Sequence, residues 1–174
     1  LDRLRLALSP PNPDSCWRFQ SDLEIRAPKS PTVRTDNRFG ATEIADLAGE
    51  VETRGQNGAV EVRDVVGGVR AETSYASLIV WNVEPATLRN RNGRISGSAI
   101  KGSVKAETSF GRFDVRLPGG LKPVVEARTR FGNIESDFPV MLNPPAADPF
   151  ASAEPGTPRV SLRNQNGNIR VSRN

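Results

Sequence analysis

Two pairs of acidic residues have the type and spacing that could do chemistry. Glu43 and Glu61 form one pair, and Asp114 and Glu135 form the other, at similar intervals along the chain. If the chain makes one turn of parallel strands in each interval, the two carboxyl groups of a pair lie about 5 Å apart. Retaining glycosidases place their acid and their nucleophile at about that separation. A divalent cation could bind between the same acids, but no aspartate-rich ligand loop accompanies them.

Composition restricts any other catalytic chemistry. The 174 residues include no histidine and one cysteine, Cys16. A Ser-His-Asp triad and a histidine metal site are therefore excluded, and so is a disulfide or metal site built from cysteines of this chain. Arg63 and Arg116 lie close to the acidic pairs and would balance them as ordinary surface carboxylates. We therefore expect no enzyme activity, no cofactor and no metal site.

A short internal repeat must position these acids. Seven segments share one pattern, clearest in VKAETSFGRFDV at residues 104–115. Their central residues are spaced by 18, 18, 17, 18, 21 and 35 positions and are Gly40, Gly58, Ala76, Gly93, Gly111, Gly132 and Gly167. A period this short and regular indicates a repeat architecture.

Apolar and polar residues alternate within each segment, as in a strand with one buried face. The phase shifts at the central residue, so the pattern predicts two strands joined by a corner at which glycine relieves the backbone. Gly111 and Gly132, which each follow a phenylalanine, are expected to hold strained backbone. The residues expected to be buried include Val51, Val60, Val62, Val69, Leu78, Val80, Val104, Ala106, Phe113 and Val115.

The residue before each central residue forms what we call the corner row. Alternation places it on the inward face, so its rings are expected to fill the corners. Its asparagines are expected to bond the corner backbone, because buried polar side chains usually satisfy backbone groups. The row comprises Phe39, Asn57, Tyr75, Asn92, Phe110, Phe131 and Asn166.

Two folds fit this pattern, and the outward charges decide between them. Each segment could be a β-hairpin about a dipeptide such as Asn57-Gly58, or one coil of a parallel β-solenoid. In hairpins, Glu107 would face Asp114, and like charges directly opposed destabilise a strand pair. In a stack, one outward position alternates in sign from coil to coil: Asp36, Arg54, Glu72, Arg89, Glu107 and Arg128. The solenoid is therefore favoured.

The sequence thus predicts an all-β, single-stranded parallel β-helix, expected to be right-handed, whose coil length equals the repeat period of about 18 residues. One domain spans residues 1–174. Residues 1–22 are expected to form an N-terminal cap and residues 23–137 the regular coils. Residues 138–158 are a proline-rich excursion without strand alternation, and residues 159–174 form a final coil. Consecutive coils are expected to stack in sequence order, since stability in a solenoid comes from neighbouring repeats.

One stretch breaks the alternation, because in LIVWNV at residues 78–83 both faces are apolar. Ile79 and Trp81 should point outward there. An exposed tryptophan beside an isoleucine makes a candidate binding surface for a partner. The alternative is that the proline-rich excursion or the N-terminal segment covers both side chains, which we favour because apolar surface beside an apolar loop is usually buried.

Charge and hydropathy restrict the partners. The formal net charge is +4, but most arginines alternate with acids and no basic stripe with stacking aromatics appears, so we expect no nucleic-acid binding. No apolar run is long enough to span a membrane. The sequence begins at Leu1 without methionine, and we expect an upstream targeting or anchoring segment to have been removed.

The repeated G-x-V-x-A-x-T-x-F-G-x-I-x-V pattern, clearest at residues 67–80 and 102–115, resembles a bacterial family of adhesin-like domains of unknown function. This family is related to head-GIN domains and to C-terminal domains of envelope stress-response proteins. The similarity covers about residues 23–137 and the last coil. The resemblance implies a single-stranded parallel β-helix displayed outside the cytoplasm, and it supplies no catalytic residues.

These observations favour a non-catalytic, extracytoplasmic module of the cell envelope, an adhesin or scaffold that binds a protein or a surface glycan. One alternative is a self-assembling, bactofilin-like filament, because stacked coils with open ends can add end to end. This alternative would make the protein a homo-oligomer. A carbohydrate-active β-helix enzyme that uses the acidic pairs is a further alternative.

Overall fold

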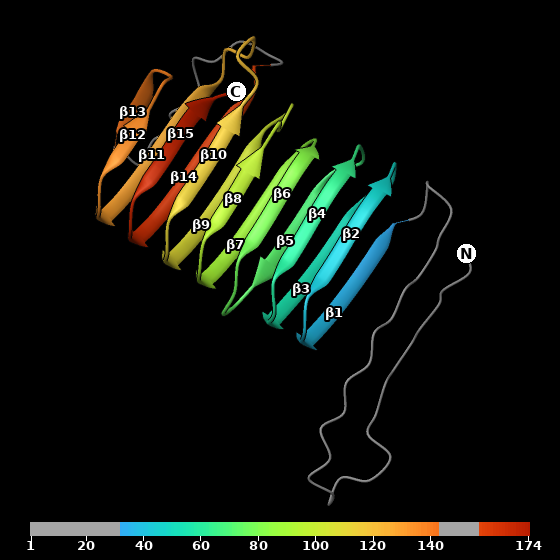
Figure 1. The fold of residues 1–174 in the computed structure, drawn as a ribbon. Coiled ribbons are helices and arrows are strands. Elements are labelled where there is room, and N and C mark those ends of the chain that lie inside the picture. The colour runs from blue at the N-terminus through green and yellow to red at the C-terminus, as the bar shows by residue number, and fades with distance from the viewer. Residues whose placement is uncertain (1–31, 143–156) are drawn as a thin grey trace, which may run out of the picture.

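The computed structural model describes residues 32–142 and 157–174. All regular structure in these residues is β-strand, in two sheets whose strand pairs are all parallel (Figure 1). The predicted cap at residues 1–22 and residues 143–156 of the excursion lie outside the described residues. No helix in the described part of the chain could cross a bilayer.

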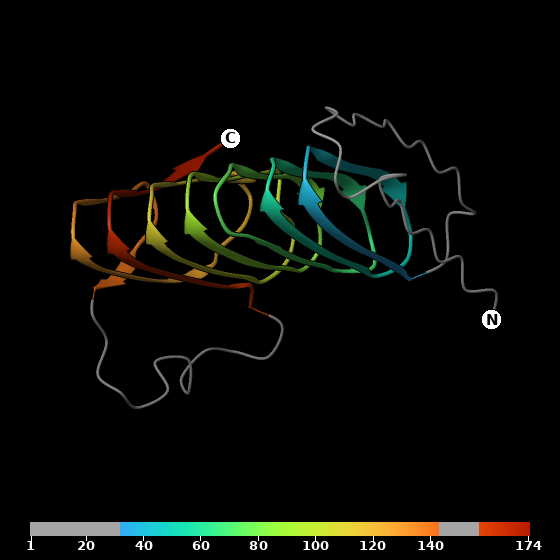
Figure 2. The ribbon, with the colours of Figure 1, turned by 90° about the horizontal axis from the view of Figure 1, so that it is seen from below.

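The chain alternates between the two sheets, so that each coil contributes one strand to each layer (Figure 2). The eight-stranded sheet has, in spatial order, β1 (Val33–Phe39), β3 (Val51–Asn57), β5 (Val69–Thr73), β7 (Ala86–Asn92), β9 (Val104–Phe110), β14 (Arg159–Asn166), β11 (Val124–Phe131) and β13 (Val140–Leu142). The seven-stranded sheet has β12 (Ile134–Ser136), β15 (Ile169–Arg173), β10 (Phe113–Leu117), β8 (Ile95–Ser98), β6 (Leu78–Val83), β4 (Val60–Val65) and β2 (Thr42–Leu47). The predicted all-β parallel solenoid is confirmed, and its strand partners on successive coils are separated by the predicted repeat period.

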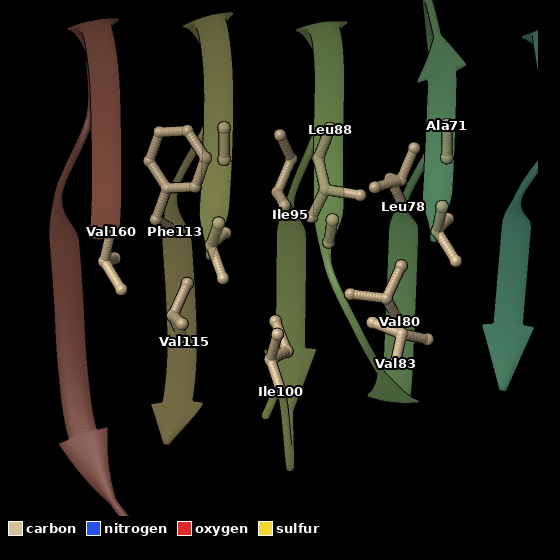
Figure 3. Packing of buried hydrophobic residues seen from close by; sticks show 14 of the residues in the cluster. Ala71, Leu78, Val80, Val83, Leu88, Ile95, Ile100, Phe113, Val115 and Val160 are labelled. Carbon is tan, nitrogen blue, oxygen red and sulfur yellow. The ribbon is translucent and has the colours of Figure 1, made fainter. Parts of the chain in front are cut away.

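The core consists of aliphatic residues stacked in register between the two sheets. Figure 3 shows part of it, in which Leu78, Ile95 and Phe113 come from the neighbouring strands β6, β8 and β10. The ten strand residues that the sequence analysis names as buried are all buried. Burial of successive β-branched side chains on one face therefore explains why these segments form strands.

The outward charge ladder is confirmed in register from Asp36 to Glu107, but its last step is wrong, because the partner of Glu107 is Arg163 on β14 and Arg128 follows Arg163 with the same sign. Arg54 is the partner of Glu72 on the next strand, Glu72 of Arg89, and Arg89 of Glu107. The Arg89 Nε atom lies 3.4 Å from Glu107 Oε2, whereas Arg54 turns back to Glu52 of its own strand, with Nη2 3.1 Å from Oε1. These exposed pairs contribute about 0–1 kcal/mol each, so their main effect is on register.

Several coils have a second corner, where one residue adopts left-handed backbone. This residue shifts the alternation between inward and outward side chains. Asp46, Asp64, Asn82 and Ala99 have φ angles of 58°, 54°, 49° and 52°. Aspartate and asparagine tolerate this region because their short polar side chains bond locally. Asn82 Nδ2 donates to Asp64 Oδ1 on the neighbouring coil at 2.6 Å. The bend lets the next residue of each coil point inward, as Val65 and Val83 do.

The coils do not stack in sequence order, which corrects one expectation. The coil formed by β14 and β15 lies between the coil of β9 and β10 and the coil of β11 and β12. We call it the inserted coil. Residues 118–123 follow β10 and lengthen the spacing between the central residues Gly111 and Gly132 to 21. This extra length carries the chain past one strand position, a distance of about 5 Å. The later segment fills the gap.

The excursion also begins later than the sequence predicts. Phe138 is buried, and β13 pairs in parallel with β11 at the outer edge of the larger sheet. Residues 138–142 therefore start another coil instead of leaving the stack. The sequence did not reveal this strand because Pro139 interrupts the alternation just before it.

Engineered disulfides should report the coil order. In a Cys16→Ser background, cysteines at positions 114 and 170 should crosslink, since these residues are partners on β10 and β15 at about 4.8 Å. Cysteines at 114 and 135 should not, because β15 lies between their strands. Non-reducing electrophoresis with free-thiol counting measures both pairs. Efficient crosslinking of 114 to 135 alone would contradict the inserted coil.

Candidate functional site

The members of the first acidic pair are adjacent, and one of them is held in an ion pair. Glu43 and Glu61 are partners on β2 and β4, as predicted. Arg63 Nη2 lies 2.6 Å from Glu43 Oε1, so this carboxylate is committed to an ion pair. A retaining glycosidase needs one carboxyl group to donate a proton and the other to attack. Glu43 is held by Arg63 instead of standing free beside Glu61.

The second acidic pair is not a pair, and the expectation that its members are neighbours is wrong. Arg170 of the inserted coil lies between Asp114 and Glu135 and is the strand partner of both. Arg94 contacts Asp114, and Arg170 Nε lies 4.0 Å from Glu135 Oε2. The acids therefore belong to an alternating surface charge row. No group of three or more potential metal ligands occurs among the described residues.

Ile79 and Trp81 lie on the outer face of β6 and are 38% and 48% exposed. Their strand partners are polar: Glu61 and Ser96 beside Ile79, and Arg63 and Ser98 beside Trp81. The N-terminal segment and most of the excursion, which we favoured as their cover, lie outside the described residues. The two residues form a small apolar patch in a polar surface, which stays a candidate contact for a partner.

The corner row is the largest departure from the predicted burial. Its four aromatic residues are Phe39, Tyr75, Phe110 and Phe131, and they are 75%, 55%, 54% and 62% exposed. Alternation had placed them inside. The corner bends the strand end away from the core, so these rings cannot fill the interior and face solvent instead.

Polar side chains two residues before the corner row close the interior. Asn90 Nδ2 donates to the carbonyl oxygen of Ala76 at 2.8 Å, and Asn164 Nδ2 donates to that of Gly111 at 2.8 Å. Thr129 Oγ1 does the same to Gly167 at 3.1 Å. These residues, and not the asparagines of the corner row, satisfy the corner backbone. The corner row bonds the corner through its backbone, as when Phe110 accepts from Gly93, and its asparagine side chains make no such bond.

Aromatic and asparagine residues alternate strictly along the corner row once the true coil order is used. Strand register places Asn57 beside Phe39, Asn92 beside Phe110, and Asn166 between Phe110 and Phe131. Backbone bonds from Tyr75 to Gln56 and from Asn92 to Ser74 place Tyr75 between Asn57 and Asn92. If the coils stacked in sequence order, Phe110 and Phe131 would be neighbours. The alternation is therefore visible only when the inserted coil is placed between them.

The carboxamides of Asn57, Asn92 and Asn166 make no hydrogen bond within the described part of the chain. They are partly or fully exposed. Each coil thus presents at one edge either an exposed ring or an unused hydrogen-bonding amide. Such surfaces combine apolar area with polar specificity, which is the composition of a binding site.

An open groove runs beside the corner row on the larger sheet. It consists of two hollows of about 550 Å³ and 290 Å³ that share Glu72 and Ser74. Together they follow six neighbouring strands, from β1 to β14. We call this hollowed strip the corner groove. It is long and shallow, so it suits an extended ligand better than a compact one.

The row of residues next to the corner row gives the groove a positive bias. It comprises Arg38, Gln56, Ser74, Arg91, Ser109, Gln165 and Arg130, without an acid. Arg38 and Arg91 make no ion pair within the described residues. Arg130 lies over the ring of Phe131, 5.5 Å from its centroid. The next row outward alternates in sign from Asp36 to Arg163, and Arg128 then follows Arg163 with the same sign.

Comparison of the chain with protein family models, with characterised proteins and with solved structures finds no match. The fold itself defines the class of protein, a parallel β-solenoid.

Proposed function

We propose that this domain is a non-catalytic binding module displayed at the bacterial cell envelope, an adhesin or scaffold. The observation that supports it best is the corner row, where exposed rings and unused carboxamides alternate over seven coils beside an open groove. An open surface of that length fits binding better than chemistry. The envelope location follows from the resemblance of the repeat to extracytoplasmic adhesin-like domains.

The acidic residues support the non-catalytic part of the proposal. Glu43 is paired with Arg63, and Arg170 separates Asp114 from Glu135. We expect no release of reducing sugar from polysaccharides incubated with the domain. Release that disappears in Glu61→Gln would instead favour a carbohydrate-active enzyme.

Retention on isolated bacterial envelope material tests the binding function. The purified domain should sediment with cell-wall and outer-membrane fractions in a saturable manner at physiological salt. A basic control protein of similar size and net charge measures non-specific attraction to anionic polymers. Retention no greater than that of the control would overturn the proposal. Long polymers of the free domain in electron micrographs would favour the filament alternative.

Protease accessibility tests the location. In intact cells that produce the full-length protein, this domain should be cleaved by added protease while a cytoplasmic marker remains whole. Protection of both until the cells are lysed would contradict an extracytoplasmic location.

A further inference from the structure

The spacing of the corner row carries information about its ligand. Neighbouring parallel strands lie about 4.8 Å apart, so aromatic residues on alternate coils lie roughly 10 Å apart. Phe39, Tyr75, Phe110 and Phe131 occupy the first, third, fifth and seventh coils in spatial order. Asparagine occupies every coil between them. The edge therefore has a repeat of two coils.

Extended β-linked polysaccharides have a matching repeat. In a ribbon-like chain of the cellulose type, successive sugars turn over, so the chain repeats after every second sugar. One sugar advances the chain about as far as one strand spacing. Sugars present apolar C–H faces that pack on aromatic rings, and hydroxyl groups that bond amides. Alternate sugars would thus meet a ring, and the sugars between them would meet a carboxamide.

The charge beside the row selects among such chains. Arg38 and Arg91 line the corner groove without an acidic partner among the described residues, and the row that contains them has no carboxylate. Guanidinium groups bind carboxylates in a planar, two-bond geometry. A chain that carries uronic-acid carboxylates complements this row better than a neutral chain does.

We propose that the corner row and corner groove bind an extended, acidic, β-linked polysaccharide that lies along the solenoid axis, one sugar to a coil. This proposal rests on the binding function proposed above and names its ligand class. Tyr75 and Phe110 are the central platforms, Asn92 lies between them, and Arg91 pairs with a carboxylate of the chain.

Oligomannuronates of defined length are the probe, and calorimetric titration of the whole domain is the measurement. Affinity should rise with chain length up to about seven sugars, the number of coils that carry the row, and should then level off. Cello-oligosaccharides of equal length, which are neutral, should bind more weakly. Malto-oligosaccharides, which coil, should not bind. Equal binding of all three, or no dependence on length, would overturn the proposal.

Substitutions locate the site. Tyr75→Ser with Phe110→Ser should weaken binding about tenfold or more, because two exposed platforms are lost. Val66→Ser, which removes an exposed apolar side chain elsewhere, should leave affinity unchanged. Arg91→Gln should weaken binding of oligomannuronate and reduce its salt dependence, whereas Arg70→Gln, outside the groove, should do neither. Melting temperatures of all four variants should stay close to that of the unmodified domain, since each side chain is exposed.

The outcomes separate this proposal from the broader one. If the domain is retained on envelope material but the double variant is retained equally, the ligand assignment fails and the binding function stands. If oligomannuronates bind at the corner row but envelope material does not retain the domain, the envelope function fails. Self-association that is lost in the double variant, together with no sugar binding, would identify a second copy of the chain as the occupant and would overturn the proposal.

Discussion

Val104→Asp is expected to leave the domain unfolded under conditions in which the unmodified domain is folded. Val104 is 2% exposed in β9, and its strand partners are Ala86 and Val160. A carboxylate at this position would be buried without a partner, which costs several kcal/mol. Small domains are stable by only about 5–15 kcal/mol, so one such change removes much of the margin. Circular dichroism with urea denaturation measures the loss.

Thr87→Asp is the matched control, because it adds the same carboxylate one strand away on the outer face. Thr87 lies between two basic residues of the neighbouring strands, Arg70 and Lys105. The new acid should stabilise the domain by about 0–1 kcal/mol, less at high salt. Native-like melting of Val104→Asp, or unfolding of both variants, would contradict the assigned faces.

Gly111→Ala is expected to destabilise the stack at a close contact between two coils. Gly111 has a φ of 156°, and an added Cβ would collide with the carbonyl oxygen of Gly93 on the adjacent coil. Strained backbone alone costs about 1–3 kcal/mol, and the colliding atom is backbone, which cannot move without disturbing the neighbouring corner. We therefore expect a clear fall in the urea midpoint.

Gly120→Ala gives the comparison, since nothing lies within 4 Å of a Cβ added there. Its effect should be close to zero or slightly stabilising, because alanine restricts the unfolded chain more than glycine does. Equal effects at the two positions would show that the corner glycine has no steric role. Gly132, with a φ of 151° against Gly167, should behave like Gly111.

The sequence predicts the coil well because every coil repeats the same local rule. Alternation assigns the inward residues, and opposite charges such as Arg54 and Glu72 assign the register between neighbours. Neither rule states which coil follows which, since the patterns of residues 124–136 and 159–173 are nearly interchangeable. Two features of the sequence pointed to the coil order. One is the spacing of 21 between Gly111 and Gly132, and the other is that Phe110 and Phe131 would be neighbours in sequence order. Their meaning depends on contacts far apart in the chain.

The sequence analysis did not recognise the corner row as an exposed surface, for a different reason. Strict alternation assigns Phe110 to the interior because it counts residues and ignores the bend at the corner. The hydrogen bond from Asn164 to Gly111 closes the interior before the corner row is reached. The acidic residues were found by type, but the Asp114–Glu135 pairing assumed sequential coils and so failed with that assumption.

The inserted coil has a mechanical consequence. A load applied to the chain at Arg173 would act on strands that are hydrogen-bonded along both edges, β14 between β9 and β11 and β15 between β10 and β12. In a sequentially wound solenoid the last coil is bonded along one edge, and tension peels it away bond by bond. Here tension must shear two interfaces in each sheet together, so an attachment through the inserted coil resists detachment better than one through a terminal coil.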